Sequence, residues 1–135
     1  MVKPTRRRST REQKRIGVMI VDDHEAVRTG LATFLEAYDD LCLVAQAGSG
    51  GEALRLCKEL RPDVVLVDVG MSRPDGVETI RAIRQADPGV QVIAMYSYED
   101  QDRLPEARCA GAIDCLRKDM HIDTLAAAIR AAGRA

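Results

Sequence analysis

Five short apolar runs recur along the chain. They cover residues 16–21, 41–46, 63–68, 90–95 and 112–116. Each run has the length and the aliphatic composition of a strand, and the runs are nearly continuous in apolar character rather than strictly alternating with polar residues. This pattern predicts five strands, each buried on both faces.

The segments between these runs show helical spacing. Leu31 and Leu35 in the first segment, and Ile80 and Ile83 in the third, are apolar residues three or four positions apart. A similar spacing follows the last run, over residues 122–129. Strands and helices that alternate in this way form a parallel sheet with helices on both faces. The predicted fold is therefore α/β, with a five-stranded, doubly wound parallel sheet.

The distribution of charged residues indicates a basic tail before the domain. A chain of 135 residues, 46% of them hydrophobic, fits one globular domain. Seven of the 20 lysines and arginines fall within the first fifteen positions, where Glu12 is the only acid, so the rest of the chain is acidic. We predict a basic, disordered tail over residues 1–15 and one domain over 16–135. An acidic domain is a poor candidate for nucleic-acid binding, whereas attachment of the tail to nucleic acid or to an acidic protein is an open alternative.

The four cysteines and the absence of long apolar runs bear on the compartment. The cysteines lie among aliphatic residues without a CxxC pair, which predicts reduced, buried thiols rather than metal ligands: Cys42, Cys57, Cys109 and Cys115. No run approaches the roughly 18 residues of a membrane span, and no signal-peptide core follows the basic N-terminus. The sequence therefore favours a soluble, cytoplasmic protein with no membrane partner.

Three acids and one lysine follow the predicted strands. Asp22 and Asp23 come after the first strand, Asp68 ends the third, and Lys118 follows the fifth. Ligands of doubly wound sheets bind beyond the carboxyl ends of the strands, so we expect these four side chains to converge. Acids in such places also cap helices, and for Asp22 or Asp23 alone a cap on the helix near Glu25 is the competing interpretation.

This group of side chains suits phosphoryl transfer. Clustered carboxylates are hard oxygen ligands of the kind that Mg²⁺ takes, together with a backbone carbonyl and water. A divalent ion would also offset the repulsion between Asp22 and Asp23. Asp68 can then act as a carboxylate nucleophile on a phosphoryl donor, while Lys118 neutralises charge on the phosphoryl oxygens.

These segments resemble a known family. The stretches "VDDHEAVRTGL", "DVVLVDVGMSRPDGVETI" and "CLRKDMHIDTLAAAI" are similar to the acidic pair, the phosphoacceptor segment and the lysine segment of response-regulator receiver domains, the NarL/LuxR type especially. The resemblance covers residues 16 to about 133, and it implies a flavodoxin-like sheet of strand order 2-1-3-4-5. It also implies that Asp68 is phosphorylated by a histidine kinase or phosphotransfer protein, that the Gly70 carbonyl joins Asp22, Asp23 and Asp68 as Mg²⁺ ligands, and that Lys118 contacts the phosphate.

The resemblance implies a signalling domain rather than an enzyme. Such a domain catalyses only its own phosphotransfer and dephosphorylation, switches an output surface, and in some cases forms a homodimer. DNA would be contacted only through an effector domain beyond Ala135, so the chain is either a single-domain receiver or an excised fragment. A small phosphatase is the competing enzyme class, but it would usually carry a D-x-D arrangement where this chain has Asp22 and Asp23.

The chain departs from the family at its switch positions. Tyr96 stands where receivers carry a serine or threonine, and its phenol oxygen lies too far from the backbone to take the place of that hydroxyl. Ser97 is expected to point to the opposite side of the extended chain. Cys115 replaces the aromatic residue of the fifth strand. These departures keep open a second interpretation, a degenerate receiver that acts as a phosphorylation-independent interaction module.

Two smaller features also lie near these motifs: the loop after Met71 and the two histidines. Receivers normally carry a proline directly after the methionine of "DxxMP", whereas Ser72 follows Met71 here and the proline comes at position 74, so we expect the loop to bend differently. His24 and His121 each precede a predicted helix, and we assign them solvated or capping roles outside the site.

Pro105 constrains the segment after the fourth strand. Proline is tolerated in the first turn of a helix but costs about 3 kcal/mol in its interior. We therefore predict a short helix that starts late, with Asp102 as its N-cap, residues 97–101 as loop and Gly111 at its end. Such a short helix is expected to open easily.

Overall fold

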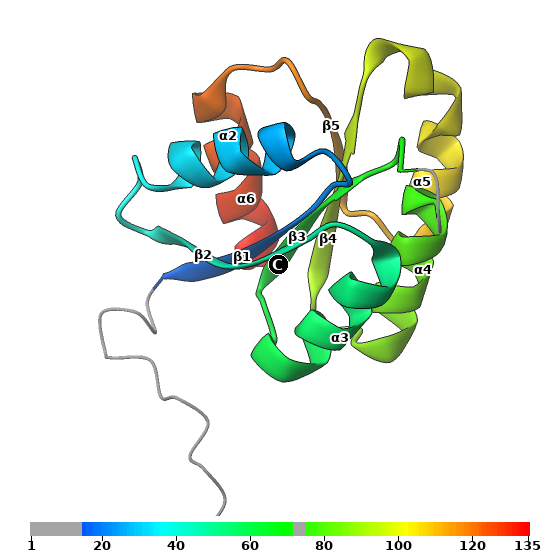
Figure 1. Cartoon of the computed structure of the whole chain (residues 1–135), viewed down its shortest axis with the longest axis horizontal. Coiled ribbons are helices and arrows are strands. Elements are labelled where there is room, and N and C mark those ends of the chain that lie inside the picture. The colour runs from blue at the N-terminus through cyan, green and yellow to red at the C-terminus, as the bar shows by residue number, and fades with distance from the viewer. Residues whose placement is uncertain (1–14, 72–74) are drawn as a thin grey trace, which may run out of the picture.

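A parallel sheet of five strands lies between two layers of helices (Figure 1). The computed structural model describes residues 15–71 and 75–135. The strands are β1 (Ile16–Val21), β2 (Leu41–Ala47), β3 (Val64–Asp68), β4 (Gln91–Tyr96) and β5 (Asp114–Arg117). All neighbouring pairs are parallel, and the strand order is β2-β1-β3-β4-β5. The predicted fold class and strand order are both confirmed.

Helices cover both faces of this sheet. They are α2 (Glu25–Leu35), α3 (Gly50–Leu60), α4 (Gly76–Ala86), α5 (Leu104–Ala110) and α6 (Ile122–Gly133), with a 3-10 helix, η1 (Tyr98–Arg103), before α5. Helices α2 and α6 pack on one face, and α3, α4 and α5 pack on the other (Figure 1). None of the described helices combines the length and the apolar character needed to cross a membrane.

Alternate residues of the central strands pack into two separate cores. Val18 and Ile20 of β1 pack with Leu35 and Ile129 from α2 and α6, whereas Met19 faces the core beneath α3, α4 and α5. Burial of one such aliphatic side chain stabilises the fold by about 1.5–3 kcal/mol. Because both faces of each central strand are covered, the strands had to be continuous apolar runs, which is why they could be located in the sequence.

The segment between β4 and β5 contains two short helices. As predicted, the α-helix starts late: α5 begins at Leu104, and Pro105 lies in its first turn. It ends at Ala110, and Gly111 follows as the C-cap residue with a φ of 120°, which glycine adopts at little cost. The predicted N-cap Asp102 is wrong, because Arg103 occupies that position. The predicted loop over residues 97–101 is also wrong, because η1 begins at Tyr98.

A local hydrogen-bonded turn accounts for the extra helix. The backbone N–H of Asp100 donates to the carbonyl of Ser97 at 2.9 Å, and the carboxylate of Asp100 accepts from the N–H of Ser97 at 3.1 Å. These two bonds close a turn upstream of Pro105, where the proline ring does not interfere. The spacing Ser-x-x-Asp was the sequence signal for this turn.

Only part of the prediction for the cysteines holds. All four are free thiols, but Cys57 alone is buried, Cys42 and Cys115 are half-buried, and Cys109 is exposed. Cys109 lies on α5 between Ala107 and Ala110, which are the residues that this helix buries, so its side chain falls on the outer side. Burial raises the pKa of the Cys57 thiol to about 11.

Two predictions concern residues that the structure does not describe. The basic tail falls outside the described residues except for Arg15, and the loop positions Ser72 and Pro74 also lie outside them.

Candidate functional site

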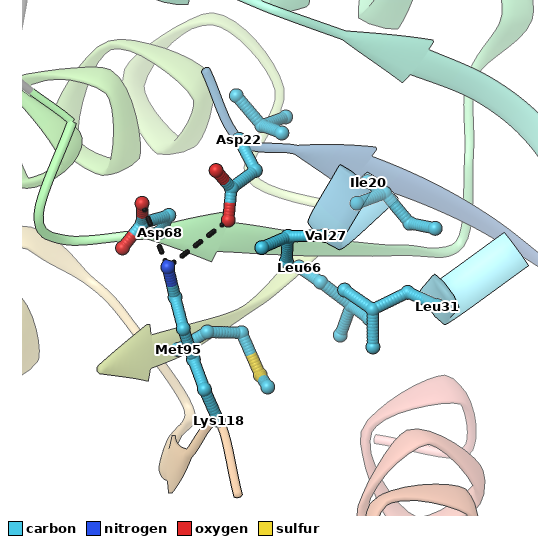
Figure 2. Close-up of a pocket in the computed structure, with 9 residues that line it drawn as sticks. Ile20, Asp22, Val27, Leu31, Leu66, Asp68, Met95 and Lys118 are labelled. Carbon is cyan, nitrogen blue, oxygen red and sulfur yellow. Dashed lines mark ion pairs between the residues drawn. The ribbon is translucent and has the colours of Figure 1, made fainter. Parts of the chain in front are cut away.

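The carboxyl ends of the strands bring two acids and a lysine together (Figure 2). Asp68 is the last residue of β3, and Asp22 directly follows β1. In the parallel pairing of these strands Val21 lies opposite Val67, so the next residues, Asp22 and Asp68, are neighbours. Each carboxylate is only 2% exposed. The predicted convergence of Asp22 and Asp68 is therefore present in the structure.

Lys118 bridges the two buried acids. Its Nζ lies 3.1 Å from Oδ2 of Asp22 and 3.0 Å from Oδ2 of Asp68. The lysine extends across the ends of β3 and β4 from its place after β5 (Figure 2). The pocket around this triad is otherwise apolar, with walls that include Ile20, Val27, Leu31, Leu66 and Met95. A low-polarity wall of this kind strengthens the attraction between the charged groups.

Burial and charge shift the protonation of this triad. Burial raises the pKa of Asp68 above its usual value, and hydrogen bonds from the Gly70 N–H, at 2.9 Å, and from Lys118 act in the opposite direction. Burial by itself lowers the pKa of Lys118, but the hydrogen bonds and charges of Asp68 and Asp22 outweigh it and the pKa is raised. Lys118 is therefore a firmly held cation that keeps two buried acids paired.

Asp23 and His24 form the outer side of the site. The Nδ1 atom of His24 lies 3.0 Å from Oδ1 of Asp22 and 3.0 Å from Oδ1 of Asp23. His24 occupies the N-cap position of α2 without a side-chain capping bond. The prediction of a solvated His24 holds in part, because its side chain is 67% exposed, yet its ring turns toward the acids. Capping of α2 by Asp22 or Asp23 is wrong, since the N-cap residue is His24.

The other histidine behaves as predicted. Nδ1 of His121 accepts a hydrogen bond from the N–H of Asp123 at 3.1 Å and caps α6. It therefore has a structural role at the start of that helix.

Four side chains of this site together offer a set of metal ligands. One ligand atom from each of Asp22, Asp23, His24 and Asp68 lies within 4.8 Å of the others. Three of the four are carboxylates, the hard donors that Mg²⁺ prefers. The N–H of Gly70 donates to Oδ1 of Asp68, so Gly70 lies beside the cluster, and its carbonyl as a metal ligand stays a prediction. The donor set fits a hard divalent cation.

Two residues of η1 border the site, and neither was predicted from the sequence. Arg103 donates from Nη1 to the carbonyl of Val69 at 2.9 Å, and its Nη2 lies 3.1 Å from Oδ2 of Asp75. Oδ2 of Asp100 lies 3.1 Å from the point where Gly70 would carry a Cβ, and Oδ1 of Asp68 lies 3.2 Å from the same point. Their sequence position gave no sign of this, because the path of η1 was not predicted.

The two altered switch positions lie at the β4–β5 edge. Tyr96 ends β4 and Cys115 lies in β5, and both side chains pack, half-buried, against the core beneath α3, α4 and α5. The main chain still connects this edge to the site, because the N–H of Lys118 donates to the carbonyl of Tyr96 at 2.8 Å.

Comparison with known proteins agrees with this geometry. A family model described as the response regulator receiver domain matches residues 18–130. The transcriptional regulatory protein LiaR of Bacillus subtilis is 40% identical over 119 residues, which are 88% of this chain and 56% of that protein. The chain therefore spans about half the length of the curated relatives that it matches.

Solved structures show the same fold. A two-component response regulator of the LuxR family from Aurantimonas sp. SI85-9A1 superposes with a TM-score of 0.82 at 32% identity, covering 89% of this chain and 86% of that one. The signal receiver domain of the putative response regulator NarL from Mycobacterium tuberculosis gives a TM-score of 0.83 at 26% identity, covering 90% and 98%. The similarity thus extends over nearly all of the described fold.

Proposed function

The chain belongs to the family of response regulator receiver domains, and we propose that it accepts a phosphoryl group on Asp68 from a histidine kinase or a phosphotransfer protein. The observation that carries this proposal is the setting of Asp68. Its carboxylate is buried at a strand end, with Lys118 Nζ 3.0 Å from Oδ2 and the Gly70 N–H 2.9 Å from Oδ1. A carboxylate held in this way is a fixed nucleophile with a cation beside the incoming charge.

The transfer exchanges one phosphorus bond for another. An oxygen of Asp68 forms a bond to phosphorus while the P–N bond of the donor phosphohistidine breaks, and the electron pair leaves with the imidazole, which is protonated as it departs. Lys118 contacts the transferred oxygens and stays near Asp22, so its charge remains balanced. Asp22, Asp23, Asp68 and the Gly70 carbonyl would hold Mg²⁺, which when bound neutralises charge on the phosphoryl oxygens.

Phosphorylation is proposed to alter an output surface rather than to produce a free product. In this view the domain has no substrate other than its own phosphoryl donor and water, and it works in the cytoplasm. Any contact with DNA would be made through an effector domain outside this chain, an idea supported by the names of relatives such as LiaR, a transcriptional regulatory protein.

The test is phosphorylation by a small donor. The protein is incubated with acetyl phosphate and Mg²⁺, and its intact mass is measured. We expect one added phosphate in the wild type and none in Asp68→Asn, which removes the nucleophile with almost no change in volume. Folding of the variant is checked by circular dichroism. A wild-type protein that takes up no phosphate would instead favour the phosphorylation-independent module that Tyr96 and Cys115 suggest.

A further inference from the structure

The carboxylate of Asp100 shares a small space with the phosphoacceptor. One of its oxygens and Oδ1 of Asp68 approach the same side of Gly70, at 3.1 Å and 3.2 Å from a single point. Gly70 has no side chain to separate them. The two acids come from different elements, since Asp68 ends β3 and Asp100 lies within η1.

A phosphoryl group on Asp68 would add negative charge near Asp100. Its oxygens extend a further bond length beyond the carboxylate oxygen that carries them. Anionic groups on the same side of one glycine repel each other where the surroundings are partly buried. Phosphorylation of Asp68 therefore disfavours the present position of Asp100.

The position of Asp100 also maintains η1. Its Oδ2 accepts the N–H of Ser97 at 3.1 Å, which is the bond that caps the start of this helix. At the other end of η1, Arg103 bonds to the carbonyl of Val69 at 2.9 Å and pairs with Asp75 at 3.1 Å. Arg103 thus attaches the end of η1 to the residue that follows Asp68, while the start of η1 is held by Asp100.

We propose that Asp100 lies beside the phosphorylation site in the resting domain and that the negative charge added to Asp68 drives its carboxylate away, so that the hydrogen bond from the Ser97 N–H breaks and η1 opens. This inference rests on the proposed phosphorylation of Asp68. It gives the chain a switch that depends on charge repulsion, and it needs neither a hydroxyl at Tyr96 nor an aromatic ring at Cys115. Asp100 also slows phosphorylation, because its negative charge repels the incoming phosphoryl group.

The test compares two acids on the same turn. Asp100→Asn removes the charge but keeps an oxygen that can accept the Ser97 N–H, whereas Asp102→Asn makes the same change in charge at an exposed position of η1. With acetyl phosphate and Mg²⁺, we expect Asp100→Asn to be phosphorylated about tenfold faster than the wild type. Asp102→Asn should stay within about twofold of the wild type, because its carboxylate does not face Gly70.

Hydrogen exchange of residues 97–103 provides the second readout. Beryllium fluoride with Mg²⁺ is used as a stable phosphoryl mimic, and it should speed exchange in the wild type and in Asp102→Asn. In Asp100→Asn the increase should be lost, since the neutral side chain is not driven off. Asp100→Ala should exchange fast even without the mimic, because its capping oxygen is missing.

The outcomes separate the two proposals. If the wild type takes up no phosphate, the proposed function fails. If it is phosphorylated on Asp68 but Asp100→Asn matches Asp102→Asn in both rate and exchange, the function stands and the role of Asp100 is overturned.

Discussion

Gly76 tests whether backbone contact holds Asp68 in place. This buried glycine begins α4 and lies against the end of β3. A Cβ built on it would be 2.1 Å from the carbonyl oxygen of Asp68 and 2.5 Å from the Cα of Val69. Both are main-chain atoms, so a flexible side chain cannot move aside to make room. Alanine at this position is expected to push α4 away from the strand that carries Asp68.

The size of the effect follows from two opposing contributions. Ordinary carbon contacts are about 3.5–4.0 Å, so the helix or the strand must move by more than ~1 Å. Overpacking of this kind costs about 1–3 kcal/mol, whereas glycine to alanine in a helix gains about 0.5–1 kcal/mol. We therefore expect Gly76→Ala to lower the free energy of unfolding by about 1–2 kcal/mol.

Gly30→Ala is the matched control. Gly30 lies in the middle of α2, and no atom lies within 4 Å of the position of its Cβ. The same substitution should raise the free energy of unfolding there by about 0.5–1 kcal/mol. Both variants are measured by urea denaturation with unchanged m-values, and Gly76→Ala should also be phosphorylated more slowly. If Gly76→Ala were as stable as Gly30→Ala, the argument from the backbone contact would be refuted.

Two further predictions concern cation binding and pH. Mg²⁺ should raise the melting temperature of the wild type by binding the native state, and Asp23→Ala should lose most of that rise; equal shifts in the two proteins, measured by differential scanning fluorimetry, would contradict the proposed ligand set. The hydrogen bond from Arg130 holds the pKa of Asp40 below its usual value. The ionised carboxylate therefore stabilises the fold at pH values above its unfolded-state pKa of about 4, and this stabilisation is lost as the pH falls through its lower pKa in the folded state. Asp40→Asn should therefore be less stable than the wild type at pH 7 and equally stable near pH 2 by urea denaturation, and a gap of the same size at both values would show that the charge of Asp40 is not the cause.

Much of the fold could be predicted because the sheet is parallel and covered on both faces. Each central strand then needs an unbroken apolar run, and a run of six such as residues 16–21 is too short for a buried helix. The same geometry allowed Asp22, Asp68 and Lys118 to be grouped from the sequence alone. Parallel strands end at one edge, so charged residues directly after them meet there whatever their separation in sequence.

The residues that were missed depend on side-chain direction and on a local turn. His24 is adjacent to Asp23 in the sequence, yet whether its ring points to solvent or to the acids depends on rotation at the start of α2. Asp100 reaches Gly70 only because residues 98–103 wind into η1. The late start of α5 could be predicted from Pro105, although not its N-cap, because the limit depends only on the proline ring and its missing N–H.

The position of Asp100 bears on one departure of this chain from the family pattern, the tyrosine at position 96. A carboxylate beside Gly70 is unfavourable next to a phosphoryl group, and the resemblance implies that tyrosine at position 96 removes the hydroxyl that would receive that group. Both residues lie on the segment from Tyr96 to Arg103, which is hydrogen-bonded to the site through Arg103 and the carbonyl of Tyr96. A segment held by polar contacts, with no buried residue in η1, can open without disturbing either core. If Asp68 is phosphorylated as proposed, the added charge would therefore alter the surface between β4 and α5 while the sheet stays intact.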